Sequence, residues 1–484
     1  MKKFYARLFS VIIATVMAFV PVRSLAAKSA DVGGADYKTC KNVIFMIGDG
    51  MGFNSINKTK LETGIKTINM DLFPMNGESK TRSADNEVTD SAAGGTALSS
   101  AVRTNNSYVG VYSDDKYALE SHPMNLAELA VAQGKKSGVI TTDLTSGATP
   151  ASFSAHTSSR TNELDITAQQ LSSDLDLIWG EKTASFDETT AKANGFDVFY
   201  DKAGMEALSE GSRSFGQFTS SVWQQTPAEN MPTMEEMTRK AIDLLDDDED
   251  GFFLMVEGAH IDKNSHSNKG EGMEDALLAF DKAIGVALEY AKTRGDTLVL
   301  VTADHETGGL TLNGEGVYEY TTDYHTGVNV PLLVYGSEGF INDGEKIDNK
   351  EVSRRVACVM GENNFPLKVE GAVKHTGVVG IEFEEKEYSL RYRSSITLSP
   401  NVIAGEGAEY SVTYLSSKTS RATVDENGTV TSVKQSNLDR GSAVILITVT
   451  DSYGRSNETA CKVNIECAWW QCIVKIALFG WLWY

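Results

Sequence analysis

Three potential metal ligands lie close together directly after a hydrophobic run. Glu257, Asp262 and His266 follow the apolar residues of segment 251–256. Carboxylate and imidazole groups are ordinary ligands of divalent cations, and Asp262 and His266 would lie one turn apart if the segment is helical. Open α/β sheets place their chemistry outside the carboxyl ends of strands. The segment therefore predicts a metal site at the end of a strand.

Two other apolar runs end in the same way. Residues 43–48 lead to Asp49, and residues 297–303 lead to Asp304 and His305. If these strands lie side by side, their carboxyl ends bring all of these acids into one region. Several carboxylates cannot remain ionised together without cations between them, so a site for more than one metal ion is the simplest expectation.

The remaining pattern predicts the architecture that positions these groups. A further strand-like run, 138–142, leads towards Thr149, and residues 273–293 have a helical pattern that ends before Gly295. Continuous apolar runs with helices between them are typical of parallel strands buried on both faces. We expect an α/β fold with a doubly wound, mostly parallel sheet and helices on both faces.

Composition limits the class of partner. The chain has 484 residues, 41% of them hydrophobic, and a formal net charge of −22. A sizeable core is expected, and nucleic acid is not an expected partner because phosphate backbones need basic surfaces. An anionic substrate remains compatible, since bound divalent cations dominate the local charge of a site.

The amino terminus predicts export. Three basic residues precede an apolar run at 8–20, and Ser24-Leu25-Ala26 forms a small-x-small cleavage site. This is the pattern of a signal peptide, which we place at residues 1–26. The protein is therefore expected to be secreted or attached to the cell envelope.

The character of the chain changes near Gly377. Residues 27–376 alternate strand-like and helix-like stretches, whereas residues 385–466 consist of short alternating strands with a hairpin turn at 425–428. This pattern predicts a small all-β sandwich, and residues 396–465 resemble bacterial immunoglobulin-like domains. We find no catalytic cluster in this part of the sequence, so a spacer or adhesive role fits it best.

The last segment, 467–484, is apolar and rich in Trp. Membrane or envelope association and packing on the β-sandwich both fit a segment of this length. The chain has five cysteines, and Cys461 with Cys467 is one local pair that they allow.

Ser91 is the candidate nucleophile. It lies in the segment 89–97, where small residues follow it, and an N-cap serine at a helix start is the alternative interpretation. A hydroxyl is a weak nucleophile unless a base or a metal activates it. No histidine lies beside it in sequence, which favours a metal.

Six segments in this order resemble the alkaline phosphatase family over about residues 41–358. They are Ile47–Gly52, Asp90–Ala93, Ala148–Ala151 followed by Arg160, Glu257–Gly258 with Asp262 and His266, Thr302–His305, and His325–Gly327. The resemblance implies a phosphate monoester hydrolase that forms a phosphoserine at Ser91, with Arg160 holding the phosphate. A homodimer is a further possible assembly.

The resemblance also implies the metals, which are two Zn²⁺ ions and one Mg²⁺ ion. Asp262, His266 and His325 would hold one zinc, Asp49, Asp304 and His305 the second, and Glu257, Thr149 and Asp49 the magnesium. Imidazole and carboxylate groups suit zinc, and an all-oxygen set suits magnesium.

One position departs from the family pattern. Some relatives have an acidic residue or a histidine two positions before the magnesium threonine, where this chain has Gly147. We expect easier loss of magnesium as a result. Lys263 either contacts phosphate through water or is a solvated surface lysine, and His260 is expected to pack or to support the ligands.

Two other functions remain open. One is phosphodiester hydrolysis in the same superfamily, although relatives with that activity often use threonine as the nucleophile. Sulfatases of this superfamily have a modifiable cysteine followed by proline and arginine. Sulfate-ester hydrolysis is less compatible with this chain, because it has Ser91 followed by Ala92 and Ala93. The other is a non-catalytic cell-surface binding protein, against which the complete ligand set argues.

Overall fold

The structure is a computed structural model that describes residues 37–383, 385–391, 393–433, 441–466 and 477. The predicted signal peptide, Cys467 and, apart from Ala477, the aromatic tail lie outside the described residues. Within the described part, the chain has no helix of the length and apolar character that a membrane crossing requires.

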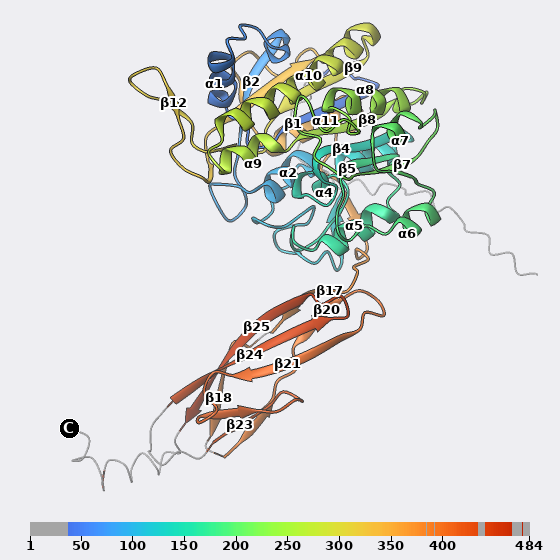
Figure 1. Cartoon of the computed structure of the whole chain (residues 1–484). Helices are drawn as coiled ribbons and strands as arrows, with labels where there is room; N and C mark the ends of the chain where they lie inside the picture. The colour runs from blue at the N-terminus through green and yellow to red at the C-terminus, as the bar shows by residue number, and fades with distance from the viewer. Residues whose placement is uncertain (1–36, 384, 392, 434–440, 467–476, 478–484) are drawn as a thin grey trace, which may run out of the picture. The chain divides into compact units, whose positions relative to one another are not determined.

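A ten-stranded sheet forms the centre of the first part of the chain (Figure 1). Nine of the strands run in the same direction, whereas β14 runs antiparallel to both of its neighbours. In spatial order the strands are β15 (Lys346–Asp348), β2 (Met75–Lys80), β14 (Val330–Tyr335), β9 (Thr297–Thr302), β1 (Asn42–Gly48), β8 (Phe252–Gly258), β4 (Lys136–Leu144), β5 (Leu177–Glu181), β7 (Ser214–Phe218) and β6 (Asp197–Phe199).

Helices contribute to a hydrophobic core on each face of this sheet. One core includes residues of α7 (Lys202–Glu206), α8 (Met234–Leu245), α9 (His260–His266), α10 (Gly270–Arg294) and the 3-10 helix η1 (Asn69–Leu72), with α1 (Phe53–Thr63) packed against it. The other includes residues of α2 (Ser91–Ser100), α3 (Leu126–Ala132), α5 (Glu163–Ser172), α6 (Glu188–Ala193) and α11 (Asn349–Val359). The short helix α4 (Ala148–Ser152) packs near α2. These two cores confirm the expected α/β class.

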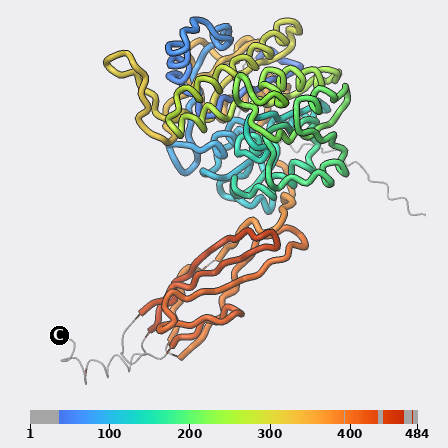
Figure 2. Tube along the Cα trace, in the orientation of Figure 1, coloured from blue at the N-terminus to red at the C-terminus, as the bar shows by residue number. Residues whose placement is uncertain are grey.

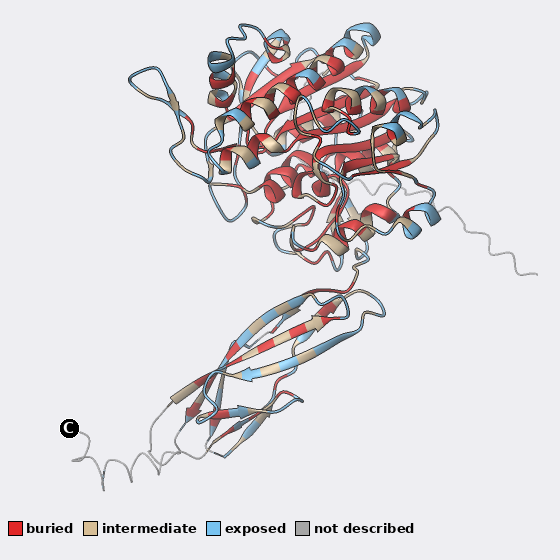
Figure 3. Cartoon of the chain, in the orientation of Figure 1, coloured by how far each residue is buried: buried red, intermediate tan, exposed pale blue. Residues whose placement is uncertain are grey.

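Strand β1 shows how the sequence produces both cores. Its side chains alternate, so that Ile44 and Met46 enter one core while Val43, Phe45 and Ile47 enter the other, and all five are fully buried. Figure 3 shows the same burial along the other central strands. Each such side chain contributes roughly 1.5–3 kcal/mol by leaving water.

Helix α10 follows its predicted range closely and ends where expected. Gly295 has a φ of 72°, a left-handed conformation that glycine adopts without a steric penalty, and its N–H donates to the carbonyl of Ala291. The helix therefore stops immediately before β9, the strand that delivers Asp304 and His305.

Among the described residues before 378, three small antiparallel pairs lie outside the large sheet. They are β10 (Glu306–Thr307) with β13 (His325–Thr326), β11 (Thr311–Leu312) with β12 (Tyr318–Glu319), and β3 (Ser121–Pro123) with β16 (Lys368–Glu370). The chain between β10 and β13 extends as a long loop that carries β11 and β12 (Figure 2). The first pair matters for the site, because it aligns His325 with Thr307.

The described residues between 378 and 466 form β-strands, apart from turns and loops. They make three sheets, namely β17 (Val378–Glu382) with β20 (Asn401–Ala404), then β18 (Glu387–Arg391), β25 (Ser456–Glu466), β24 (Gly441–Asp451) and β21 (Tyr410–Ser416), and finally β19 (Ser395–Thr397), β23 (Thr429–Ser432) and β22 (Ala422–Val424). The predicted hairpin at 425–428 joins β22 to β23. The all-β character is confirmed, whereas the immunoglobulin-like assignment and the domain limits stay predictions.

Candidate active site and metal centre

The carboxyl ends of three neighbouring strands bring the acids together. In the sheet, Ile47 of β1 is aligned with Glu257 of β8 on one side and with Thr302 of β9 on the other. Asp49 and Asp304 each lie two residues beyond these aligned positions. All three acids are buried, so the register of the central strands positions this group of ligands.

One histidine joins two of these acids. The Nε2 atom of His305 lies 3.6 Å from Oδ1 of Asp49 and 3.2 Å from Oδ2 of Asp304. The three side chains form one of the groups whose ligand atoms could hold a metal ion together. Burial and the neighbouring His325 keep the pKa of His305 well below its ordinary value, which leaves its ring neutral and able to ligate.

A second group surrounds Asp262 and His266, which helix α9 presents one turn apart. Oδ1 of Asp262 lies 3.3 Å from Nε2 of His266 and 3.6 Å from Nε2 of His325. The two Nε2 atoms are only 3.0 Å apart. The rings of His305 and His325 stack with centroids 3.5 Å apart, so the two groups are contiguous. We call Asp262, His266, Asp304, His305 and His325 the imidazole cluster.

Backbone carbonyls orient two of these rings. Nδ1 of His266 lies 2.6 Å from the carbonyl of Asp323, and Nδ1 of His325 lies 2.9 Å from the carbonyl of Thr89. An N–H at each Nδ1 leaves the lone pair on Nε2, the arrangement found in metal-ligating histidines. Two lone pairs that face each other are repulsive unless a proton or a cation lies between them, and a cation fits this donor set.

Ser91 begins helix α2 and faces the imidazole cluster. Its Oγ lies 3.3 Å from Nε2 of His305, although the two residues are far apart in sequence. Asp90, not Ser91, is the N-cap, because its carboxylate accepts from the backbone N–H of Ala93. The alternative interpretation of Ser91 as the capping residue is therefore wrong.

Asp90 also holds Arg160. Nη1 of Arg160 donates to Oδ2 of Asp90 at 3.1 Å, and the same oxygen accepts from the backbone N–H of Ser107. Arg160 and Ser91 line one cavity of about 420 Å³, together with Asn86, Val88, Thr89, Asp90, Asn106, Asp262, His266, Tyr324 and His325. A candidate nucleophile, a guanidinium and three ligands of the imidazole cluster thus share one space.

The third group contains only oxygen ligands, and we call Asp49, Thr149 and Glu257 the oxygen cluster. Oε2 of Glu257 accepts from Oγ1 of Thr141 on strand β4. Burial, with the nearby carboxylate of Asp143, raises the pKa of Glu257 to about 8. Thr149 enters from helix α4, whose proximity to β8 places its hydroxyl on this side of the site.

Unpaired buried oxygens show that the residues fit cations. Oδ1 of Asp49, Oδ2 of Asp304 and Oγ1 of Thr149 are all buried and have no hydrogen-bond partner among the described residues. Leaving a buried polar atom without a partner costs about 1–3 kcal/mol, and more for a charged one. Burial and the neighbouring carboxylates of Asp304, Asp262 and Glu257 raise the pKa of Asp49 well above its ordinary value. Cations would satisfy all three atoms.

Lys263 and His260, the two neighbours of the ligands on α9, have separate partners. Nζ of Lys263 forms an ion pair with Oδ1 of Asp143, and Lys263 does not line the cavity that contains Ser91. Its side chain is exposed, which is compatible with the surface lysine considered from the sequence, and the contact with phosphate stays a prediction. The ring of His260 stacks on Trp223, with centroids 5.1 Å apart and planes 11° apart, which is consistent with a packing role.

Another cluster, His122, Glu128 and His156, lies outside this site. His156 contacts Oε1 of Glu128 at 2.9 Å and the carbonyl of Gly110 through its other nitrogen. The carboxylate outweighs the effect of burial and raises the pKa of His156, so a buried ion pair accounts for these two side chains.

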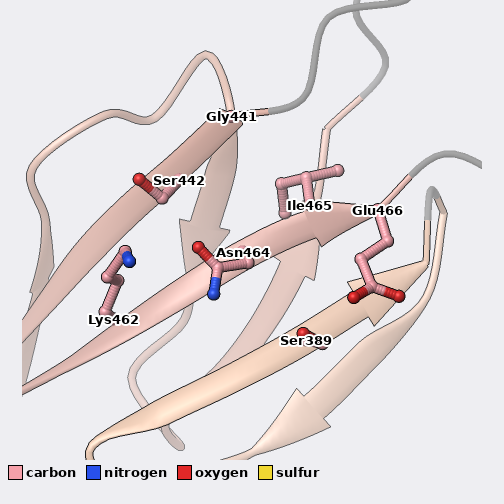
Figure 4. Close-up of a pocket in the computed structure, with 7 residues that line it drawn as sticks. All are labelled: Ser389, Gly441, Ser442, Lys462, Asn464, Ile465 and Glu466. Carbon is pink, nitrogen blue, oxygen red and sulfur yellow. The ribbon is translucent and has the colours of Figure 1, made fainter.

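The carboxyl-terminal sheets contain a different kind of depression. A pocket of about 460 Å³ lies across β18, β24 and β25 and is lined by Ser389, Gly441, Ser442, Lys462, Asn464, Ile465 and Glu466 (Figure 4). Lys462 and Asn464 both donate to Glu387, which occupies their polar groups. Its described lining includes neither a histidine nor a cysteine, and it resembles an ordinary polar sheet surface.

Several residues of the site were missed from the sequence. Thr307 donates to Oδ1 of Asp262 and lies 3.2 Å from Nδ1 of His305, and Thr141 supports Glu257. Asp90 was recognised only as part of a motif. A threonine within a strand gives no local signal of such contacts, whereas an aspartate before a small-residue helix does predict an N-cap.

Comparisons with known proteins agree with this geometry. The family profile for alkaline phosphatase matches residues 40–180 and 192–352. Alkaline phosphatase 3 of Bacillus subtilis is 31% identical over 351 residues, which are 67% of this chain and 74% of that protein. Alkaline phosphatase of Escherichia coli is 29% identical over 389 residues, covering 62% of this chain and 82% of that protein.

A solved structure shows the same relationship. Alkaline phosphatase from the Antarctic bacterium TAB5 is 32% identical, with a TM-score of 0.57 over 68% of this chain and 99% of that one. The matched segments contain the imidazole cluster, the oxygen cluster and Ser91. The chain belongs to the alkaline phosphatase family and is a phosphatase hydrolase.

Proposed function

We propose that the protein hydrolyses phosphate monoesters through a phosphoserine formed on Ser91. One observation carries this proposal. Oγ of Ser91 lies 3.3 Å from Nε2 of His305, in the cavity that also holds Arg160 and three ligands of the imidazole cluster. A nucleophile, an anion-binding guanidinium and a cation site in one cavity are the parts that phosphoryl transfer requires.

The metal content we propose is two Zn²⁺ ions and one Mg²⁺ ion. One zinc would be held by Asp262, His266 and His325, whose potential ligand atoms lie 3.0–3.6 Å apart. The other would be held by Asp49, Asp304 and His305, and magnesium by Glu257, Thr149 and Asp49. Mixed nitrogen and oxygen donors support zinc, and oxygen donors alone support magnesium. Bound cations of this kind lower the pKa of a hydroxyl and neutralise charge on phosphoryl oxygens.

The chain's own residues then perform definite tasks. Ser91 gives up its hydroxyl proton, and its Oγ attacks phosphorus. The bond to the leaving alkoxide breaks, the alkoxide takes up a proton and departs as an alcohol, and the phosphoryl group becomes attached to Ser91. Arg160, which Asp90 holds at the cavity wall, donates N–H groups to the phosphoryl oxygens in the bidentate manner of a guanidinium. Water then cleaves the phosphoserine, releases phosphate and restores the hydroxyl.

Two structures of a related enzyme contain magnesium. Two variants of the TAB5 enzyme, each with a histidine replaced by an acidic residue, are described as having magnesium bound in a site named M3. We propose that the oxygen cluster is the corresponding site in this chain. We also propose that the protein acts outside the cytoplasm, on the basis of the signal-peptide pattern in residues 1–26.

A trapping experiment tests the serine route. Acid quenching during turnover should leave a phosphate on Ser91, detectable by peptide mass spectrometry, and Ser91→Ala should lower turnover by roughly three or more orders of magnitude. Arg160→Ala should weaken phosphate binding yet still allow the phosphoserine to form. An unmodified Ser91 under conditions of full turnover would contradict the proposal.

A substrate panel separates the alternative functions. We expect p-nitrophenyl phosphate to be hydrolysed far faster than bis(p-nitrophenyl) phosphate or p-nitrophenyl sulfate. Faster hydrolysis of the diester would favour a phosphodiesterase. No turnover of any of the three, with zinc and magnesium supplied, would favour a binding protein.

A further inference from the structure

Gly147 leaves a space that another residue fills. A Cβ atom placed on Gly147 would lie 2.8 Å from Oδ2 of Asp143 and 3.0 Å from the carbonyl of Leu144. The carboxylate of Asp143 therefore lies where a side chain at position 147 would begin. Gly147 is two residues before Thr149, a ligand of the oxygen cluster, so this carboxylate lies beside the proposed magnesium site.

Two contacts connect Asp143 to the oxygen cluster. Its backbone N–H donates to Oγ1 of Thr141 at 2.9 Å, and the same hydroxyl donates to Oε2 of Glu257. Among the neighbouring charges, the carboxylate of Asp143 raises the pKa of Glu257 the most. The end of strand β4 thus fixes a carboxylate close to a ligand of the site without making that carboxylate a ligand.

The ion pair with Lys263 gives this carboxylate a second effect. Lys263 follows Asp262 on helix α9, and its Nζ contacts Oδ1 of Asp143. An unpaired ammonium group so near the cluster would repel a divalent cation. The carboxylate of Asp143 neutralises the charge of Lys263. Removal of Asp143 would therefore take away a negative charge and leave the ammonium group of Lys263 unpaired.

We propose that Asp143 is the positioning residue of the magnesium site and replaces the side chain that Gly147 lacks. This inference rests on the proposed function, because it assumes that the oxygen cluster holds magnesium. It reverses the expectation drawn from Gly147 alone, since the site keeps its supporting carboxylate from a different position in the sequence. Replacing Gly147 by aspartate in the natural chain should not strengthen magnesium binding, because its Cβ atom would crowd Oδ2 of Asp143 at 2.8 Å.

Exchange of the carboxylate between the two positions tests the proposal. The zinc-loaded full chain is dialysed against a series of Mg²⁺ concentrations, and bound magnesium is measured by elemental analysis. Asp143→Ala should weaken magnesium binding by about 10–100-fold, the usual cost of losing a supporting group of a metal site. The double variant Asp143→Ala with Gly147→Asp should regain the natural affinity to within about threefold, because the new carboxylate enters the vacated space.

A matched control lies on the same strand. Lys136, at the start of β4, forms an ion pair with Asp247, and Asp247→Ala removes a Lys–Asp contact on the strand of Asp143 without touching the site. It should leave magnesium affinity unchanged. Asp143→Asn, which keeps the shape but not the charge, serves if the alanine variant does not fold, and it should also weaken binding.

The outcomes separate this proposal from the proposed function. Unchanged magnesium affinity in folded Asp143→Ala or Asp143→Asn would overturn the role of Asp143 while leaving the metal site intact. If Gly147→Asp does not restore the magnesium affinity of Asp143→Ala, the carboxylate of Asp143 does not take the place of a side chain at position 147. A natural chain that binds no magnesium beside its zinc would overturn the magnesium site itself, and the role of Asp143 with it.

Discussion

The imidazole cluster and the oxygen cluster are adjacent, but they are held in different ways. In the imidazole cluster, backbone carbonyls of Asp323 and Thr89 fix the rings of His266 and His325. In the oxygen cluster, the hydroxyl of Thr141 donates to Glu257, burial and the carboxylate of Asp143 raise the pKa of Glu257, and Thr149 has no hydrogen-bond partner among the described residues. Backbone acceptors remain when side chains change, whereas side-chain support can be lost in a single substitution.

This difference indicates which cluster is more sensitive to substitution of the residues around its ligands. The imidazole cluster depends on its ligands, on main-chain carbonyls and on one supporting side chain, Thr307. The oxygen cluster depends on neighbours that other residues can replace, as Gly147 and Asp143 illustrate. We therefore expect substitutions of ligands to affect both clusters strongly, and substitutions of neighbours to affect chiefly the oxygen cluster.

The largest effect on the comparison should come from His325→Ala. It removes a ligand of the imidazole cluster and the ring that stacks on His305, so zinc affinity should fall by more than about 100-fold, and turnover with it. Elemental analysis should show the loss of one zinc while magnesium is retained at high concentration. Unchanged zinc content would show that His325 is not a ligand.

Glu257→Gln should have the next largest effect, this time on the oxygen cluster. The amide keeps the shape of the carboxylate but removes the charge that favours magnesium, so magnesium affinity should fall by about 10–100-fold. Zinc content should not change. Loss of zinc and magnesium together would show that the two clusters are not independent.

Removal of all metals should make stability depend on pH in a defined direction. The pKa of Glu257 in the folded chain is about 8, above its ordinary value of 4.5. A carboxyl of this kind stabilises the fold fully below the unfolded pKa, and this contribution is lost as pH rises through the folded pKa. The melting temperature of chelator-treated protein should therefore fall between about pH 4.5 and pH 8.

The metal-loaded protein provides the contrast, because cations favour ionised ligands and should remove this fall. Chelator-treated Glu257→Gln should also show a smaller decrease than the natural chain over the same range. An equal decrease in both would assign the pH dependence to other groups.

The smallest effect should follow from Thr141→Val. This change removes a hydroxyl that donates to Glu257 and accepts from the backbone of Asp143, while it keeps the shape of the side chain. Magnesium affinity should fall by about tenfold, with zinc affinity unchanged. Thr307→Val is the matching change in the imidazole cluster, since Thr307 donates to Asp262. If Thr307→Val lowers zinc affinity more than Thr141→Val lowers magnesium affinity, the oxygen cluster is not the one that depends more on its neighbours.

The hydrophobic pattern of the sequence was sufficient to predict the buried strands of the central sheet. The buried runs before Asp49, Glu257 and Asp304 are strands β1, β8 and β9, and they are neighbours in the sheet. Strand β25 was not predicted, because its first half is exposed and polar and only Cys461, Val463 and Ile465 mark its buried face. Pattern is informative only where one face of an element is consistently apolar.

The family motifs named candidate site residues, but not the contacts between them. The structure brings Asp49, Asp304 and His305, and Asp262, His305 and His325, close enough together to share a metal ion, whereas the ligand roles stay predictions. The proximity of Ser91 to His305 and the pairing of Asp143 with Lys263 could not be read from spacing, because each joins residues more than a hundred positions apart. Such contacts depend on which strands are neighbours.

The most direct test is the metal content per chain of three proteins loaded under identical conditions. The natural chain should contain two zinc ions and one magnesium ion, Glu257→Gln should lose only magnesium, and His266→Ala should lose only one zinc. Independent losses would support two clusters with separate supports. Loss of all metals in either variant, or a natural chain without magnesium, would contradict the division of the site on which this account depends.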